Sequence, residues 1–340
     1  MRSLRLLSLG LGAAIALTGC ASPDAGTDGP VVPSATSTDA GPAEQERETG
    51  LTRPAMVFGG DCDAVFSDAE LASVMGESLT LGNNHFSELW GGDALFNQNG
   101  GFECTWGGQE SRVIALVLPE AAVEYTPKAY ECSDTHDSYA LSCTMESVVN
   151  GIRLSGLSTL GQDPAAAVSA RDALLAIFAE KAAKQTPVPV PLPAIGSWIL
   201  PPDCVGIASG ADFSAVPGLG AGTTDGGVLG AGKDVTQAEE AIAPGWFPKT
   251  CSVQGESVMV EYVPVGGSRW REDEIAARAD ASPLTLTGVE AAYAVPFDDG
   301  RSIVYAFSGP NMLAFTVRYP KNAAGIATTL FASLDATAVR

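Results

Sequence analysis

The sequence predicts an α+β protein with two homologous domains, each an antiparallel sheet with a short capped N-terminal helix and a C-terminal helix. Two observations lead to this fold class. An internal repeat begins at Asp61-Cys62 and again at Asp203-Cys204, and in each copy a second cysteine is followed by a series of strand-like runs. Strand and helix patterns do not alternate as they do in a doubly wound parallel sheet.

Each copy opens with the signature of a short helix. The offsets from the first cysteine are identical in the two copies: Ser67, Glu70, Leu71, Val74 and Gly76 match Ser209, Asp212, Phe213, Val216 and Gly218. A serine followed three residues later by an acid is a capping box, and a glycine is a common helix end. Because Pro217 interrupts the second copy, we expect its helix to be shorter or partly 3₁₀.

The strands follow in the same order in both copies. Cys104 precedes the apolar run 113–118, and Cys251 precedes 258–263. A hairpin is predicted next, turning at 134–137 in the first copy and at 298–300 in the second. One further strand is expected at 152–157 and at 313–317. A C-terminal helix then runs from Asp163 toward Lys184, and from about Ala323 to Ala336.

The N-terminus has the pattern of a secretory signal. Arg2 and Arg5 precede an apolar run, 6–17, that is too short to span a bilayer. The run ends in Leu17-Thr18-Gly19-Cys20, which resembles the bacterial lipobox. That resemblance implies cleavage before Cys20 and acylation of its thiol with palmitate-type chains, hence a lipid anchor in the cell membrane with the protein facing outside the cytoplasm.

Composition divides the chain further. Residues 1–19 are the expected signal peptide, and 20–57 are expected to form a disordered tether behind the acylated cysteine. The first repeat is assigned to 58–184 and the second to 201–340. Between them, 185–200 is rich in alternating prolines, which favour a stiff polyproline II spacer.

Charge and cysteine content limit the partners and the compartment. A formal net charge of −21 makes the chain strongly acidic, so we expect no nucleic-acid partner. The cysteines other than Cys20 form an even set, typical of disulfides in an oxidising compartment.

Repeat symmetry selects one pairing of these six cysteines among fifteen. Cys62 and Cys104 occupy the same repeat positions as Cys204 and Cys251, so each of these pairs is expected to form one bridge, and Cys132 is left with Cys143. Counted from the matched Ala-Tyr pairs of the two copies, Val295 and Ala306 are the expected facing counterparts of that third bridge.

Few residues point to catalysis. The chain has two histidines. His136 lies among aspartates at 134–137, where a weak metal site competes with a solvated turn, and we expect no metal there. No Gly-x-Ser-x-Gly motif supplies a nucleophile for a hydrolase that would use either histidine. The glycine-rich run 227–233 resembles a P-loop, but Asp234 takes the position of its Ser/Thr. We expect no cofactor, and neither histidine to be essential.

Two long loops in equivalent places, 77–103 and 219–250, are the best candidates for binding. They carry His85, Trp90, Trp246 and Phe247 among glycines and asparagines. Such aromatic residues either contact a ligand or fold back to cover the sheet.

The whole pattern resembles a known kind of protein. The lipobox, the tether, the early Asp-Cys with its capped helix, and Cys104-Thr105-Trp106 are similar to actinobacterial cell-envelope lipoproteins built from small uncharacterised α+β domains. The second copy departs from this pattern, with Cys251-Ser252-Val253. The resemblance implies location and architecture, and no mechanism.

The sequence therefore favours a non-enzymatic binding or accessory module of the cell envelope. The expected partners are the membrane, through the lipid anchor, and an envelope protein or small ligand. A solute-binding lipoprotein of a transporter is the alternative, and an envelope hydrolase a further one. The solute-binding alternative is weakened because a single proline-rich segment, and not a hinge of several crossings, joins the two copies.

Overall fold

The computed structural model describes the chain in segments. They are 52–82, 92–122, 132–134, 141–200, 204, 211–219, 223–226, 251–255, 259–297, 300–318 and 320–335. Among these residues no helix is both long enough and apolar enough to cross a bilayer.

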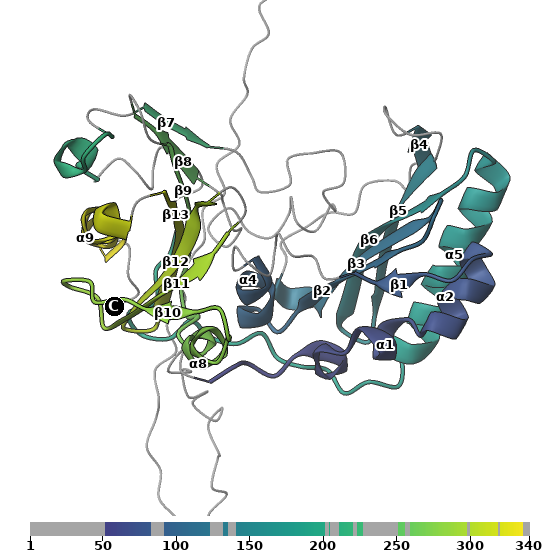
Figure 1. Ribbon diagram of the computed structural model, residues 1–340. Helices are drawn as coiled ribbons and strands as arrows, with labels where there is room; N and C mark the ends of the chain where they lie inside the picture. The colour runs from purple at the N-terminus through teal and green to yellow at the C-terminus, as the bar shows by residue number, and fades with distance from the viewer. Residues whose placement is uncertain are drawn as a thin grey trace, which may run out of the picture. The chain divides into compact units, whose positions relative to one another are not determined.

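The first sheet is antiparallel and six-stranded, in the order β1-β2-β3-β6-β5-β4. Its strands are β1 (Thr80–Leu81), β2 (Phe102–Gly107), β3 (Arg112–Pro119), β4 (Cys132–Asp134), β5 (Leu141–Val149) and β6 (Ile152–Leu160). The accompanying helices are η1 (Val57–Gly60), α1 (Cys62–Val65), α2 (Asp68–Met75), α4 (Gly92–Gln98), η2 (Glu120–Ala122) and α5 (Pro164–Ala182). Figure 1 shows α5 and α2 on one side of this sheet.

The second sheet is antiparallel and seven-stranded, in the order β10-β11-β12-β13-β9-β8-β7. Its strands are β7 (Thr223–Gly226), β8 (Cys251–Gln254), β9 (Met259–Val265), β10 (Ser282–Pro283), β11 (Ala291–Pro296), β12 (Ser302–Ser308) and β13 (Asn311–Val317). Its helices are η3 (Phe213–Ala215), α8 (Arg271–Ala276), η5 (Pro320–Asn322) and α9 (Ala323–Leu334). The predicted α+β fold, with a sheet and a C-terminal helix in each copy, is confirmed.

The two sheets share one connectivity. In reverse order, the second sheet matches the first strand for strand, with β10 added at its edge. The registers agree as well. Across four central strands, one row of paired residues is Cys104, Ala115, Gly156 and Met145, and the equivalent row is Cys251, Tyr262, Phe315 and Val304. The repeat seen in the sequence is therefore a repeat of sheet topology.

One expectation about the outer hairpin is wrong. Val295 pairs with Ile303 and Ala306 pairs with Ala292, so Val295 and Ala306 do not face each other. Cys132 faces Cys143, 11 residues later, whereas the equivalent facing pair of the second sheet is Pro296 and Ser302. The second hairpin is shorter, so a single offset cannot align both of its strands.

In the first copy, the helix ends form as the sequence predicts. Ser67 Oγ accepts from the Glu70 N–H, and a Glu70 carboxylate oxygen accepts from the Ser67 N–H at 2.8 Å, which is a complete capping box. Gly76 ends α2 with a positive φ of 77°. In the second copy the helical element is only a 3₁₀ turn, η3, as expected from Pro217. Its N-cap is Asp212, whereas the sequence predicts Asp212 as the third residue after the cap, and Ser209 lies outside the described residues.

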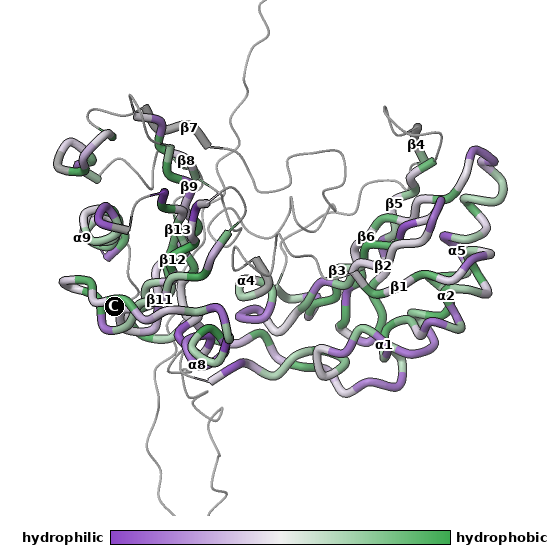
Figure 2. The backbone as a smooth tube through the Cα atoms, in the orientation of Figure 1, coloured by the Kyte–Doolittle hydropathy of each residue, from purple (hydrophilic) through white to green (hydrophobic). Residues whose placement is uncertain are grey.

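Each sheet buries one face against its C-terminal helix. Ala170, Leu174 and Phe178 of α5 pack in one cluster with Trp106 and other residues of β2, β3 and β6. Ile326, Leu330 and Leu334 of α9 pack in the same way in one cluster with residues of the second sheet. Figure 2 shows hydrophobic residues running through the strands and alternating with hydrophilic ones along α5.

The structure also refines two expected boundaries. Val57, at the end of the predicted tether, is fully buried, and its N–H donates to the Gly100 carbonyl at 3.0 Å. In the predicted spacer, Trp198 is 5% exposed; its backbone N–H donates to Asn311 Oδ1 and its indole N–H to Asp335, each at 3.0 Å. The last part of the linker is therefore packed against the second sheet.

Candidate functional site

The candidate binding residues His85, Trp90, Trp246 and Phe247 lie outside the described residues, as do His136 and the glycine-rich run 227–233. The described part of the first loop contains β1 and α4. Phe96 of α4 is 4% exposed, so this loop aromatic is a packing residue.

The three predicted disulfides are present. Cys62–Cys104 and Cys204–Cys251 have Cα–Cα distances of 5.8 and 5.4 Å, and Cys132–Cys143 has one of 4.0 Å. The first two bridges tie the opening helix or turn of each repeat to the strand that follows its long loop. Each bridge therefore encloses the N-terminal segment and the candidate binding loop of its repeat, and the second cysteine holds the C-terminal end of that loop.

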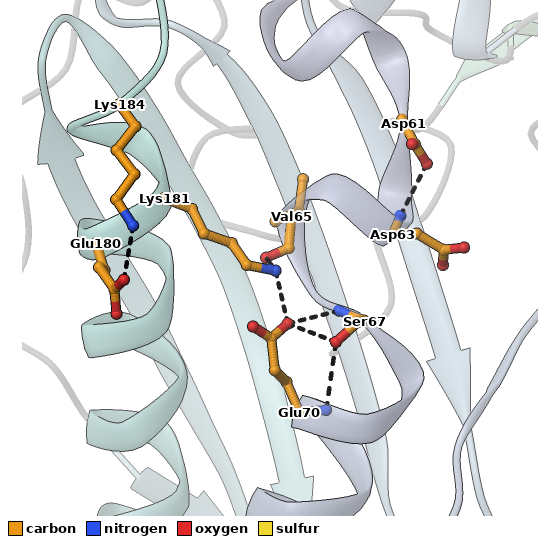
Figure 3. A network of polar contacts seen from close by, with 8 residues as sticks. All are labelled: Asp61, Asp63, Val65, Ser67, Glu70, Glu180, Lys181 and Lys184. Carbon is orange, nitrogen blue, oxygen red and sulfur yellow. Dashed lines mark hydrogen bonds and ion pairs between the residues drawn. The ribbon is translucent and has the colours of Figure 1, made fainter.

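A second tie in the first repeat is polar. Lys181 Nζ of α5 donates to a Glu70 carboxylate oxygen at 2.6 Å and to the Val65 carbonyl at 3.2 Å (Figure 3). Burial raises the pKa of Glu70, but the bonds from Lys181 and Ser67 outweigh it and the net shift is downward. This network holds the N-terminal helices against α5, which is a structural role.

The most unusual chemical group lies on the face of the first sheet that is turned away from α5. Met145 packs toward α5, so Glu146, the next residue of β5, points to the opposite face. Ser155 of β6 faces Glu146 and donates its hydroxyl hydrogen bond to the carboxylate, and Arg153 Nη1 lies 3.4 Å from the other carboxylate oxygen. We call Glu146, Arg153 and Ser155 the buried polar cluster.

Burial dominates the electrostatics of this cluster. The exposed fractions of Glu146, Arg153 and Ser155 are 3%, 4% and 0%. Desolvation raises the pKa of Glu146 above its ordinary value, although Ser155 and Arg153 act in the opposite direction. A carboxyl group with a raised pKa can hold or release a proton nearer to neutral pH than an exposed glutamate.

The equivalent positions of the second sheet carry no charged residue. Tyr305 faces Ala314 as Glu146 faces Ser155, and Met312 stands where Arg153 does. All three are fully buried in a cluster with Trp270 and Ile275, around α8. The sheet topology therefore forms without a charged pair at this place, so the polar cluster is specific to the first repeat.

Sequence reasoning did not find this cluster. Glu146 and Arg153 alternate with apolar neighbours, which is also the pattern of a solvent-exposed strand face. The available signal was the repeat itself: once the rows of the two sheets are aligned, Glu146 and Arg153 fall on Tyr305 and Met312.

The charged segment around Trp270 is held by ion pairs both within the segment and to residues farther along the chain. Arg269 pairs with Glu272 and with Glu290, and Arg278 pairs with Asp280. Trp270 is only 7% exposed. These contacts hold α8 on the second sheet, so the segment is explained by packing.

Within the described segments, no group of three or more His, Cys, Asp or Glu side chains is placed to hold a metal ion. Comparison with protein-family models, with curated proteins and with solved structures finds no match.

Proposed function

We propose that the chain is a membrane-anchored extracytoplasmic lipoprotein that acts as a binding or accessory module of the cell envelope. The Leu17–Cys20 motif after a short apolar run supports the anchor. The observation that carries the proposal is the set of three disulfides, all formed within a repeat, because such bridges are stable in oxidising compartments outside the cytoplasm.

The division of the chain fits this role. A tether within 20–57 would separate the folded repeats from the membrane. The loops of both repeats, which carry aromatic residues and each end next to a disulfide-bonded cysteine, would contact an envelope protein or a small ligand. The buried polar cluster distinguishes the first repeat from the second, which has no charged residue at the equivalent positions.

The anchor is tested by mass spectrometry of the protein extracted from membranes. We expect the mature N-terminus to be Cys20, with a diacylglyceryl group on its thiol and an acyl chain on its amine. The matched control is Cys20→Ala, which should stay unprocessed or be released without lipid. A wild-type product that is soluble and cleaved at another residue would disprove the proposed location.

Binding through the loops is tested separately by in-cell photocrosslinking. A crosslinking amino acid at Trp90 or Trp246 should capture one discrete product. The same amino acid at Glu180, whose side chain is 75% exposed on α5, is the control and should capture none. Equal capture from all three positions would contradict a binding role for the loops.

A further inference from the structure

The Cys132–Cys143 bridge differs from the other two disulfides in its place in the fold. It joins two directly facing residues of neighbouring strands, and one of these strands, β4, is a three-residue strand at the edge of the first sheet. The other bridges each join a short N-terminal element to a strand. We propose that Cys132–Cys143 is a reversible thiol–disulfide exchange site that reacts with a dithiol, whereas Cys62–Cys104 and Cys204–Cys251 are structural.

The apolar surroundings of the three bridges support this distinction. Cys104 belongs to the main core of the first repeat, and Cys204 and Cys251 belong to that of the second. Cys143 instead lies in a small separate cluster with Leu141 and Ala167. Opening the Cys132–Cys143 bridge therefore does not disturb either main core.

The lengths of chain that the three bridges close also support a reversible Cys132–Cys143 bridge. The Cys132–Cys143 bridge spans 11 residues, and the other two span 42 and 47. Because a short loop restricts the unfolded chain least, its opening gives up the least stability. The second sheet has Pro296 and Ser302 at the equivalent facing positions, so this topology forms without a bridge there.

The two sulfurs are also unequal. Cys143 is fully buried, and Cys132 is only partly buried, so Cys132 is the more accessible of the two to an incoming thiolate. Arg171 Nη1 of α5 lies 4.0 Å from the Cys132 sulfur. A guanidinium at this position would stabilise a thiolate on Cys132 and favour its release. Arg171 also pairs with the exposed Asp172, which holds the guanidinium in this orientation.

The exchange takes place in two steps. One thiolate of the dithiol attacks the Cys132 sulfur and forms a mixed disulfide; the Cys132–Cys143 bond breaks, and Cys143 leaves with the electron pair and takes a proton. The second thiolate of the dithiol then attacks the other sulfur of the dithiol, which is bonded to Cys132, and closes the dithiol's own disulfide. Cys132 leaves as a thiolate beside Arg171 and is protonated in turn. The dithiol is oxidised by two electrons, and the bridge is reduced by two.

The test is a redox titration of the full purified chain without denaturant. The protein is equilibrated with mixtures of reduced and oxidised dithiothreitol, the free thiols are alkylated, and peptides are mapped by mass spectrometry. We expect Cys132 and Cys143 to be alkylated at a ratio of reduced to oxidised dithiothreitol roughly tenfold or more below that needed for the other four cysteines. Opening of all three bridges at one ratio, or of Cys62–Cys104 first, would overturn the proposal.

The role of Arg171 is tested kinetically in the partly reduced chain. Arg171→Gln should slow the alkylation of Cys132 at neutral pH by about three- to tenfold. Lys184→Gln removes an exposed cation just beyond the end of α5 and is the control, with an unchanged rate. Unchanged alkylation in Arg171→Gln would remove Arg171 from the proposal. The titration is independent of the lipid anchor, so it can fail while the proposed location holds.

Discussion

At the scale of single residues, the buried polar cluster is the feature that most needs an explanation. A buried ion pair seldom adds stability over apolar residues of similar volume, because both charges lose their hydration. The second repeat has the uncharged residues Tyr305, Met312 and Ala314 in the same sheet position. Stability alone therefore does not explain the presence of Glu146 and Arg153 in the first repeat.

We expect a single substitution and a triple variant in this cluster to have different effects on the free energy of unfolding. Arg153→Met alone leaves Glu146 buried without its cation and should destabilise the protein by about 3–5 kcal/mol. The triple variant Glu146→Leu, Arg153→Met and Ser155→Ala should be as stable as the wild type or more stable. Urea unfolding followed by circular dichroism measures both. A triple variant less stable than Arg153→Met would show that the cluster is structural.

Among single residues, the sequence predicts the contacts between near neighbours in the chain and misses those that depend on strand register. Ser67, Glu70 and Gly76 form the predicted capped helix because capping depends on near neighbours in the chain. The partners of Glu146 follow from strand register, which is set across the whole sheet. The cysteine pairs were predictable because the repeat supplies the long-range information that a single copy lacks.

At the scale of elements, the contact between α2 and α5 depends on the ionised form of Glu70. The pKa of Glu70 is lowered in the folded protein from an ordinary value of 4.5. Stability from the Lys181 contact is thus complete above that value and is lost as pH falls through the lower folded-state pKa.

We therefore expect Glu70→Gln to be less stable than the wild type at pH 7, by about 0.5–1 kcal/mol for a partly exposed pair. The difference should shrink steadily below pH 4.5, where the wild type also loses the charge. Glu180→Gln, which removes the exposed partner of Lys184 on the same helix, is the control and should change stability little. A deficit of Glu70→Gln that does not change with pH would mean that shape, and not charge, links the two helices.

The outer hairpin shows which features of the sheets the sequence predicts and which it does not. The order of the strands and the C-terminal helices follow from hydrophobic pattern and turn residues. The facing residues of the last strand pair do not, because hairpin length differs between the copies: Cys132 faces Cys143, whereas Pro296 faces Ser302. A register inferred from one offset holds only until the first difference in loop length.

At the scale of the whole molecule, the three bridges should differ in their contribution to stability. By loop entropy, removal of Cys62–Cys104 or Cys204–Cys251 as a double Cys→Ser variant should cost about 4 kcal/mol each, and removal of Cys132–Cys143 about 3. Denaturant unfolding of the three double variants gives the order. If the Cys132–Cys143 variant were the least stable, the bridge would have to be reclassified as part of the structural framework.

Under the proposed N-terminal lipid anchor, the bridge Cys62–Cys104 would also have a mechanical consequence. The N–H of Val57 is hydrogen-bonded to the Gly100 carbonyl. Cys62 follows shortly after Val57 in the chain and is joined by its disulfide to Cys104, 42 residues later. Tension that enters the first repeat passes through the sulfur–sulfur bond and bypasses that loop. About 140 Å of contour length, at roughly 3.4 Å per residue, therefore stays hidden under load. The candidate binding loop of the first repeat lies inside this closed segment and would stay unloaded even while the rest of the repeat is stretched.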